Sequence, residues 1–104
     1  MTFMHDREAA FEARFAHDAD LRFRCAARQG KLAGLWAADL LGLEGAAAQA
    51  YARDLAAAGT EAAGDTGLIR KLCSDLGTRA DQATIRARLA EAMAEAQRQV
   101  LGET

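Results

Sequence analysis

The sequence predicts an all-α protein, a four-helix bundle-like domain with a long first helix and a mobile or frayed N-terminal segment. Much of the 51% hydrophobic fraction is alanine, the residue with the highest helix propensity. Proline is absent and aromatic residues make up only 6% of the chain, which leaves little to nucleate a sheet. Apolar residues recur at steps of three, four or seven, which is the spacing of one helix face. A chain of 104 residues has room for one modest core.

The first predicted helix is the longest and runs from about Asp18 to Leu41. Gly42 follows it and is expected to end it, because glycine readily adopts the left-handed conformation found after helices. One face is apolar and is interrupted by Arg28. Its apolar positions are Leu21, Cys25, Leu32, Trp36, Leu40 and Leu43.

The second predicted helix runs from about Ala46 to Ala58, after a tight turn at Gly45. Tyr51 lies on its apolar face, and Tyr51 and Trp36 are predicted to be the largest core residues. The stretch from Gly59 to Gly67 has no helical period and carries three glycines. It is therefore predicted to be the longest loop of the folded part.

Two further helices follow, each with a predicted aspartate cap. Asp65 is expected to cap a short third helix that ends at Gly77, and Asp81 is expected to cap a fourth helix that ends near Gly102. Their predicted buried residues are Leu68, Ile69, Leu72 and Leu76 in the third helix, and Ile85, Leu89, Met93, Ala96 and Val100 in the fourth. Cys25 and Cys73 are far apart without a CxxC spacing, so both are predicted to be small buried or half-buried residues with no disulfide.

Charge and hydropathy narrow the class of partner. The 13 basic and 15 acidic side chains are interleaved along the chain and leave a formal net charge of −2, which argues against a nucleic-acid partner. No apolar run approaches the roughly 18 residues of a membrane span, so no direct membrane insertion is expected. The first six residues lack the charged and apolar regions of a signal peptide. A cytoplasmic location is therefore predicted.

Residues 1–17 differ from the rest of the chain in helical phase. At about 100° per residue, Met4, Phe11 and Phe15 fall within roughly 40° of one another and form a narrow apolar ridge. The apolar stripe of the following helix is rotated from this ridge by roughly 70°. We therefore divide the chain into a docking segment, residues 1–17, and a bundle domain, residues 18–104. The predicted partner contacts are the ridge and its charged flanks: Phe3, Met4, Arg7, Glu8, Phe11, Glu12, Arg14 and Phe15.

Periodicity alone leaves two interpretations of this ridge open. Its aromatic side chains either enter a groove on a partner or cover the open end of the chain's own bundle. Burying an exposed phenylalanine side chain is favourable by about 1.5 to 3 kcal/mol of free energy. An apolar ridge of this kind is therefore expected to pack against another surface.

The residues give little support for catalysis, and we predict that the protein is not an enzyme. His5 and His17 are twelve residues apart with no cysteine in ligand spacing, so no metal site is expected. The only serine, Ser74, has no triad partners in sequence. No cofactor is expected. Weak adenine-nucleotide binding stays open, because the stretch Gly64 to Gly67 followed by Lys71 is weakly similar to a phosphate loop, although it lacks the serine or threonine after the lysine.

With these residues in view, the chain resembles the zeta subunit of alphaproteobacterial F1Fo ATP synthase, an ATPase inhibitor family formerly known as a domain of unknown function. The resemblance covers nearly the whole chain, and two blocks are the most specific. They are Phe11-Glu12-Ala13-Arg14-Phe15-Ala16-His17-Asp18 and Leu35-Trp36-Ala37-Ala38. Further matching residues are Asp6-Arg7-Glu8, Lys31-Leu32, Leu41-Gly42-Leu43, Ala50-Tyr51-Ala52, Arg70-Lys71 and Ile85-Arg86.

The resemblance implies a regulatory subunit that inhibits ATP hydrolysis by F1Fo ATP synthase. In that family the N-terminal segment, here Phe3 to Phe15, inserts into an α/β catalytic interface of the cytoplasmic F1 sector and blocks rotation in the hydrolysing direction, with the γ subunit as a candidate further contact. Synthesis is spared because rotation the other way expels the segment, and the bundle anchors it. Gln29-Gly30 departs from the Arg-Asn pair expected there, and a glycine inside a helix predicts local weakness.

Two alternatives from other function classes remain. The chain could be a helical self-associating or adaptor protein that binds another partner through the same ridge. It could also be a small-ligand module that holds an adenine nucleotide between helices near Trp36 and Tyr51.

Overall fold

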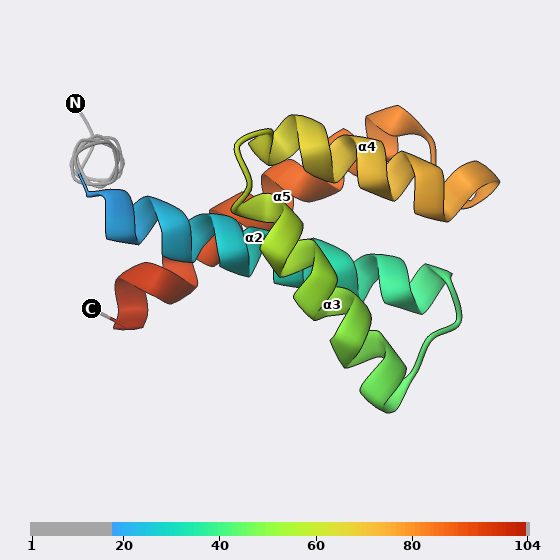
Figure 1. Cartoon of the computed structure of the whole chain (residues 1–104), viewed down its shortest axis with the longest axis horizontal. Helices are drawn as coiled ribbons and strands as arrows, with labels where there is room; N and C mark the ends of the chain where they lie inside the picture. The colour runs from blue at the N-terminus through green and yellow to red at the C-terminus, as the bar shows by residue number, and fades with distance from the viewer. Residues whose placement is uncertain (1–17, 104) are drawn as a thin grey trace, which may run out of the picture.

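The computed structural model describes residues 18–103, which form four α-helices and one 3-10 helix and contain no strand (Figure 1). The all-α prediction is confirmed. The elements in chain order are α2 (Ala19–Leu40), α3 (Gly45–Gly59), α4 (Gly64–Leu76), the 3-10 helix η1 (Gly77–Arg79) and α5 (Gln82–Glu103).

Helix α2 is the centre of the arrangement and contacts each of the other three α-helices. Helix α5 returns alongside α2, so that the start of α2 and the end of α5 lie side by side (Figure 1). Helix α3 crosses α2, and α4 packs against α3 and α5. The packing of α5 on α2 fixes the end of the bundle from which the N-terminal residues leave.

The predicted helix ends are largely confirmed by cap geometry. The Asp18 carboxylate accepts a hydrogen bond from the Leu21 amide at 3.1 Å and caps α2. Asp81 accepts one from the Thr84 amide at 2.8 Å and caps α5. Gly77 has a φ of +56° after α4, which only glycine adopts without strain, as predicted for that position.

The start of α4 differs from the prediction. The loop before it comprises only residues 60–63, and α4 begins at Gly64 with Ala63 at the cap. Asp65 was predicted to be the cap, and this is wrong, because it lies inside the first turn. Gly64 has a φ of +53° and lets the chain turn directly into the helix. The negative charge of Asp65 still stabilises α4, because it lies near the positive end of the helix dipole.

The main core is formed by aliphatic side chains from all four α-helices. Its largest fully buried members are Leu55, Leu68, Leu72, Leu76 and Ile85. The prediction that Trp36 and Tyr51 are the largest core residues is wrong, since both are only half-buried at the edge of this cluster. Each has a polar or charged partner at the surface, which keeps part of its ring in contact with solvent.

The buried face of α2 is made of smaller residues than predicted. Leu40 is 38% exposed, and Leu32 is only half-buried. The buried positions instead form two rows, each with a residue at every fourth position. The first row is Leu21, Cys25, Gln29, Ala33 and Ala37. The second row is Gly30, Gly34 and Ala38, and its two glycines face α3. Cys25 is buried and Cys73 half-buried, and both are free thiols, as predicted.

Glycines let α2 and α3 approach closely. A Cβ placed on Gly30 would lie 2.7 Å from the Leu55 carbonyl carbon and 2.8 Å from the Ala56 Cα. A Cβ on Gly34 would lie 2.8 Å from the Ala52 Cα. Gly30 therefore does not mark a weak point of α2, as its helix propensity suggested. The helix continues through it, and its missing side chain makes room for the α3 backbone.

Candidate functional site

The residues predicted to contact a partner all precede α2 and lie outside the described residues. They are Phe3, Met4, Arg7, Glu8, Phe11, Glu12, Arg14 and Phe15. The described part of the candidate site is the base from which this segment leaves, namely Asp18 and the first turns of α2.

Asp18 determines how the chain enters α2. Its backbone is extended, with φ −115° and ψ 100°. Its carboxylate accepts a hydrogen bond from the Leu21 amide, which has no acceptor within the helix. Its carbonyl accepts the first helical hydrogen bond, from the Arg22 amide at 3.1 Å. The helix that carries the buried stripe thus begins next to the residue at which the helical phase of the sequence changes.

The first turns of α2 are held by the last turns of α5. Leu21 and Cys25 form a second buried cluster with Val100, and Met93 packs against it. Full burial of a leucine or valine side chain, such as Leu21 or Val100, stabilises a protein by about 1.5 to 3 kcal/mol. This small cluster is the part of the core that lies nearest to the N-terminal segment in sequence.

Two arginines add polar contacts around this cluster. The Arg28 guanidinium donates to the Gln99 amide oxygen at 2.7 Å and to the Glu103 carboxylate at 2.6 Å. Arg24 lies 3.7 Å from the same carboxylate. These pairs are partly exposed and are worth at most about 1 kcal/mol each, so the apolar cluster carries the stability and the pairs fix the orientation.

Cys25 is a packing residue within this base. Burial raises the pKa of its thiol, while the positive charges of Arg24 and Arg28 lower that pKa by a smaller amount. The thiol is therefore neutral and enclosed at physiological pH, which is the condition of an unreactive cysteine.

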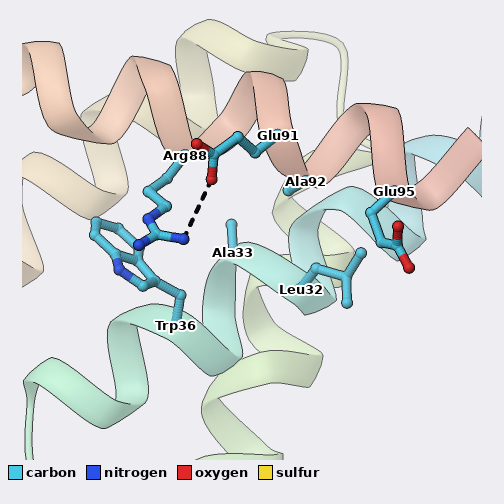
Figure 2. A pocket seen from close by; sticks show the side chains of 7 residues that line it. All are labelled: Leu32, Ala33, Trp36, Arg88, Glu91, Ala92 and Glu95. Atoms are coloured by element: carbon cyan, nitrogen blue, oxygen red, sulfur yellow. Dashed lines mark hydrogen bonds and ion pairs between the residues drawn. The ribbon is translucent and has the colours of Figure 1, made fainter.

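A shallow groove between α2 and α5 contains Trp36 (Figure 2). The Arg88 guanidinium lies over the Trp36 ring, 5.6 Å from its centroid, and donates to the Glu91 carboxylate at 3.2 Å. The groove holds about 180 Å³, which is below the roughly 300 to 1,000 Å³ of typical ligand pockets. Figure 2 shows Leu32 and Ala33 on the α2 side, with Ala92 and Glu95 on the α5 side.

Tyr51 does not line the groove that contains Trp36, and its contacts are with α4. Its hydroxyl donates to the Asp75 carboxylate at 2.8 Å, and the Lys71 ammonium lies 3.1 Å from that carboxylate and 5.6 Å from the centroid of the tyrosine ring. These contacts join α3 to α4. They also engage Lys71, the lysine of the stretch that is weakly similar to a phosphate loop.

Residues 18–103 contain no group of three or more His, Cys, Asp or Glu side chains placed to hold a metal ion. None of the helices described is both long enough and apolar enough to cross a membrane.

Comparison of the chain with known proteins finds one matching family. A family model described as ATPase inhibitor subunit zeta matches residues 1–99, which include both the N-terminal segment and almost all of the bundle. A search of the curated proteins finds no significant match.

Proposed function

The chain belongs to the ATPase inhibitor subunit zeta family, and from this premise we propose that it inhibits ATP hydrolysis by F1Fo ATP synthase with its N-terminal segment. Residues 1–17 insert into an α/β catalytic interface of F1 and obstruct rotation in the hydrolysing direction. The bundle remains outside and anchors the segment. The family is one of inhibitor subunits, so the role is regulatory rather than catalytic.

The single observation that carries this proposal is the extent of the family match. It begins at residue 1 and therefore takes in every residue that the phase argument selected. Within that segment the apolar ridge has acidic residues on one flank and basic residues on the other, an arrangement suited to a groove with a defined orientation.

The geometry of the base supports the same proposal. A segment that stops a rotating complex has to resist displacement, so its attachment should be firm. Asp18 caps α2 immediately after the segment, and the Leu21–Cys25–Val100 cluster holds the following turns to α5. A force that displaces the segment would therefore act on the packed helices α2 and α5 rather than on a flexible loop.

Deletion of residues 1–16 tests the proposal. The truncated chain should keep its helical signal and cooperative melting but should no longer inhibit hydrolysis by the cognate F1. Inhibition equal to that of the full chain would contradict the proposal. Replacing Phe11 and Phe15 by serine should act like the deletion. Replacing Ala9 and Ala13 by serine is the matched control, because these two positions lie on the opposite side of the helical projection from the ridge.

A further inference from the structure

We propose that a groove beside Phe23, where α3 crosses α2, is a second docking surface, and that it takes an apolar segment of the ATPase flanked by acidic residues. The inference rests on the proposed function and extends it, because it assigns to the bundle a contact of its own. We call this surface the Phe23 groove; its lining residues are Phe23, Arg24, Ala27, Arg28, Lys31 and Ala56.

Phe23 is the most exposed large hydrophobic side chain of residues 18–103, at 59% of its surface. It lies one helical turn before Ala27 and two before Lys31, so the three share one side of α2. Ala56 of α3 forms the opposite wall. The groove holds about 240 Å³, which suits one or two apolar side chains of a protein partner better than a small-molecule ligand.

The rim of the Phe23 groove is basic. Arg24, Arg28 and Lys31 all contribute to it. Glu103 neutralises part of the charge of the two arginines, and Asp20 lies 3.8 Å from Arg24. Lys31 makes no ion pair with any of residues 18–103, so it is the least compensated charge of the rim. The groove therefore presents positive charge around an apolar floor, on a chain whose formal net charge is −2. Acidic residues on the partner would complement this rim.

The position of the groove favours the ATPase as the source of the bound segment. Phe23 is five residues after Asp18, which is about 8 Å along the helix axis. A protein that holds residues 1–17 is therefore already next to the groove. A second weak contact on the same partner then acts at a high effective concentration and raises the overall affinity without a large interface.

The test uses the full chain with the variants Phe23→Ser and Lys31→Glu, and measures binding to F1 separately from inhibition of hydrolysis. Phe23→Ser should weaken binding by about tenfold or more, since a ring of this size contributes about that factor when it is buried. Lys31→Glu should weaken binding several-fold, and its binding should depend less on salt than that of the wild type. At saturating concentration both variants should still inhibit hydrolysis fully.

Two controls match these variants. Leu40→Ser removes another exposed apolar side chain, 38% exposed, at the far end of α2. Arg79→Glu reverses a charge on η1, away from the groove. Both should bind F1 within about twofold of the wild type, because single surface substitutions of this kind change binding or stability little.

Three outcomes would overturn the Phe23 groove proposal. Unchanged binding of Phe23→Ser and Lys31→Glu would show that the groove makes no contact with F1. Tighter binding would show that the chain's own N-terminal segment covers the groove. Concentration-dependent dimerisation lost in Phe23→Ser, with F1 binding unchanged, would assign the groove to a second copy. Failure of the proposed function looks different, because the wild type would then bind F1 without inhibiting hydrolysis.

Discussion

Replacing Gly30 by alanine should destabilise the protein, although the same change stabilises most helices. In an open helix the change gains up to about 1 kcal/mol of helix propensity. At Gly30 the added methyl group meets the α3 backbone, 2.7 Å from the Leu55 carbonyl carbon and 2.8 Å from the Ala56 Cα. A backbone cannot rotate away as a side chain can, so α2 and α3 must separate by about 1 Å to reach ordinary contact distance.

Overpacking of this kind costs about 1 to 3 kcal/mol, and the rigid contact places Gly30 at the upper end of that range. The net loss after the gain in propensity is then about 2 kcal/mol, or about 10 °C in melting temperature for a domain of this size. Urea unfolding followed by circular dichroism and by Trp36 fluorescence would measure it. Gly102→Ala is the control, since a Cβ there meets nothing within 4 Å and should be neutral or slightly stabilising. A Gly30→Ala protein as stable as the wild type would refute the close approach of α2 and α3.

Two further predictions concern polar side chains that join neighbouring helices. Burial, followed by the hydrogen bond to Asp75 and the negative charges of Asp75 and Asp54, raises the pKa of Tyr51, the chain's only tyrosine, above its ordinary value near 10. The folded state holds this proton more tightly than the unfolded state, so the resulting stability is complete below about pH 10 and declines as the pH rises toward the folded pKa. Tyrosinate absorbance in a titration should therefore develop at higher pH in the native protein than in urea, and coincident curves would contradict the prediction. Gln29 is 2% exposed and its amide donates to the Leu89 carbonyl at 3.1 Å. Gln29→Met, which keeps the volume, should cost about 1 kcal/mol, whereas Gln29→Ala should cost about 2 to 3 kcal/mol. Equal losses in urea unfolding would show that packing around this side chain contributes nothing.

The helix ends could be predicted because they depend on local chemistry. Asp18 and Asp81 accept amide hydrogen bonds at two helix starts, and Gly77 adopts a positive φ after α4. Each effect involves residues within one turn, so it can be read directly from the sequence. Asp65 was the exception, because Gly64 also has a positive φ and allows α4 to begin two residues earlier than a cap at Asp65 would.

The buried face of α2 could not be predicted from hydrophobicity alone. Large apolar residues such as Leu40 appeared to belong to the core, whereas the closest packing is at Gly30 and Gly34. How close two helices approach depends on the residues of both, and α3 offers a wall of small residues around Ala52 and Ala56 at this crossing. Propensity describes one helix in isolation and therefore treats a glycine as a defect.

Part of the candidate site could likewise be predicted from the sequence, and part could not. The N-terminal contacts were predicted from helical phase and lie outside the described residues, so they stay a prediction. Phe23 was not among the residues predicted to contact a partner. The available signal was an aromatic residue outside the apolar stripe of α2, with a lysine two turns later on the same side. That pattern becomes informative only when the position of α3 beside it is known.

Photo-crosslinking from position 11 is the most direct test of an inhibitory N-terminal segment. A photoreactive phenylalanine analogue in place of Phe11, in the full chain bound to the cognate F1, should form its products with the α or β subunit. The same analogue at Leu40, which is exposed at the end of α2 far from the Phe23 groove, should not form these products. Products from position 11 that join only the chain to itself, while hydrolysis is fully inhibited, would contradict insertion of the segment at a catalytic interface.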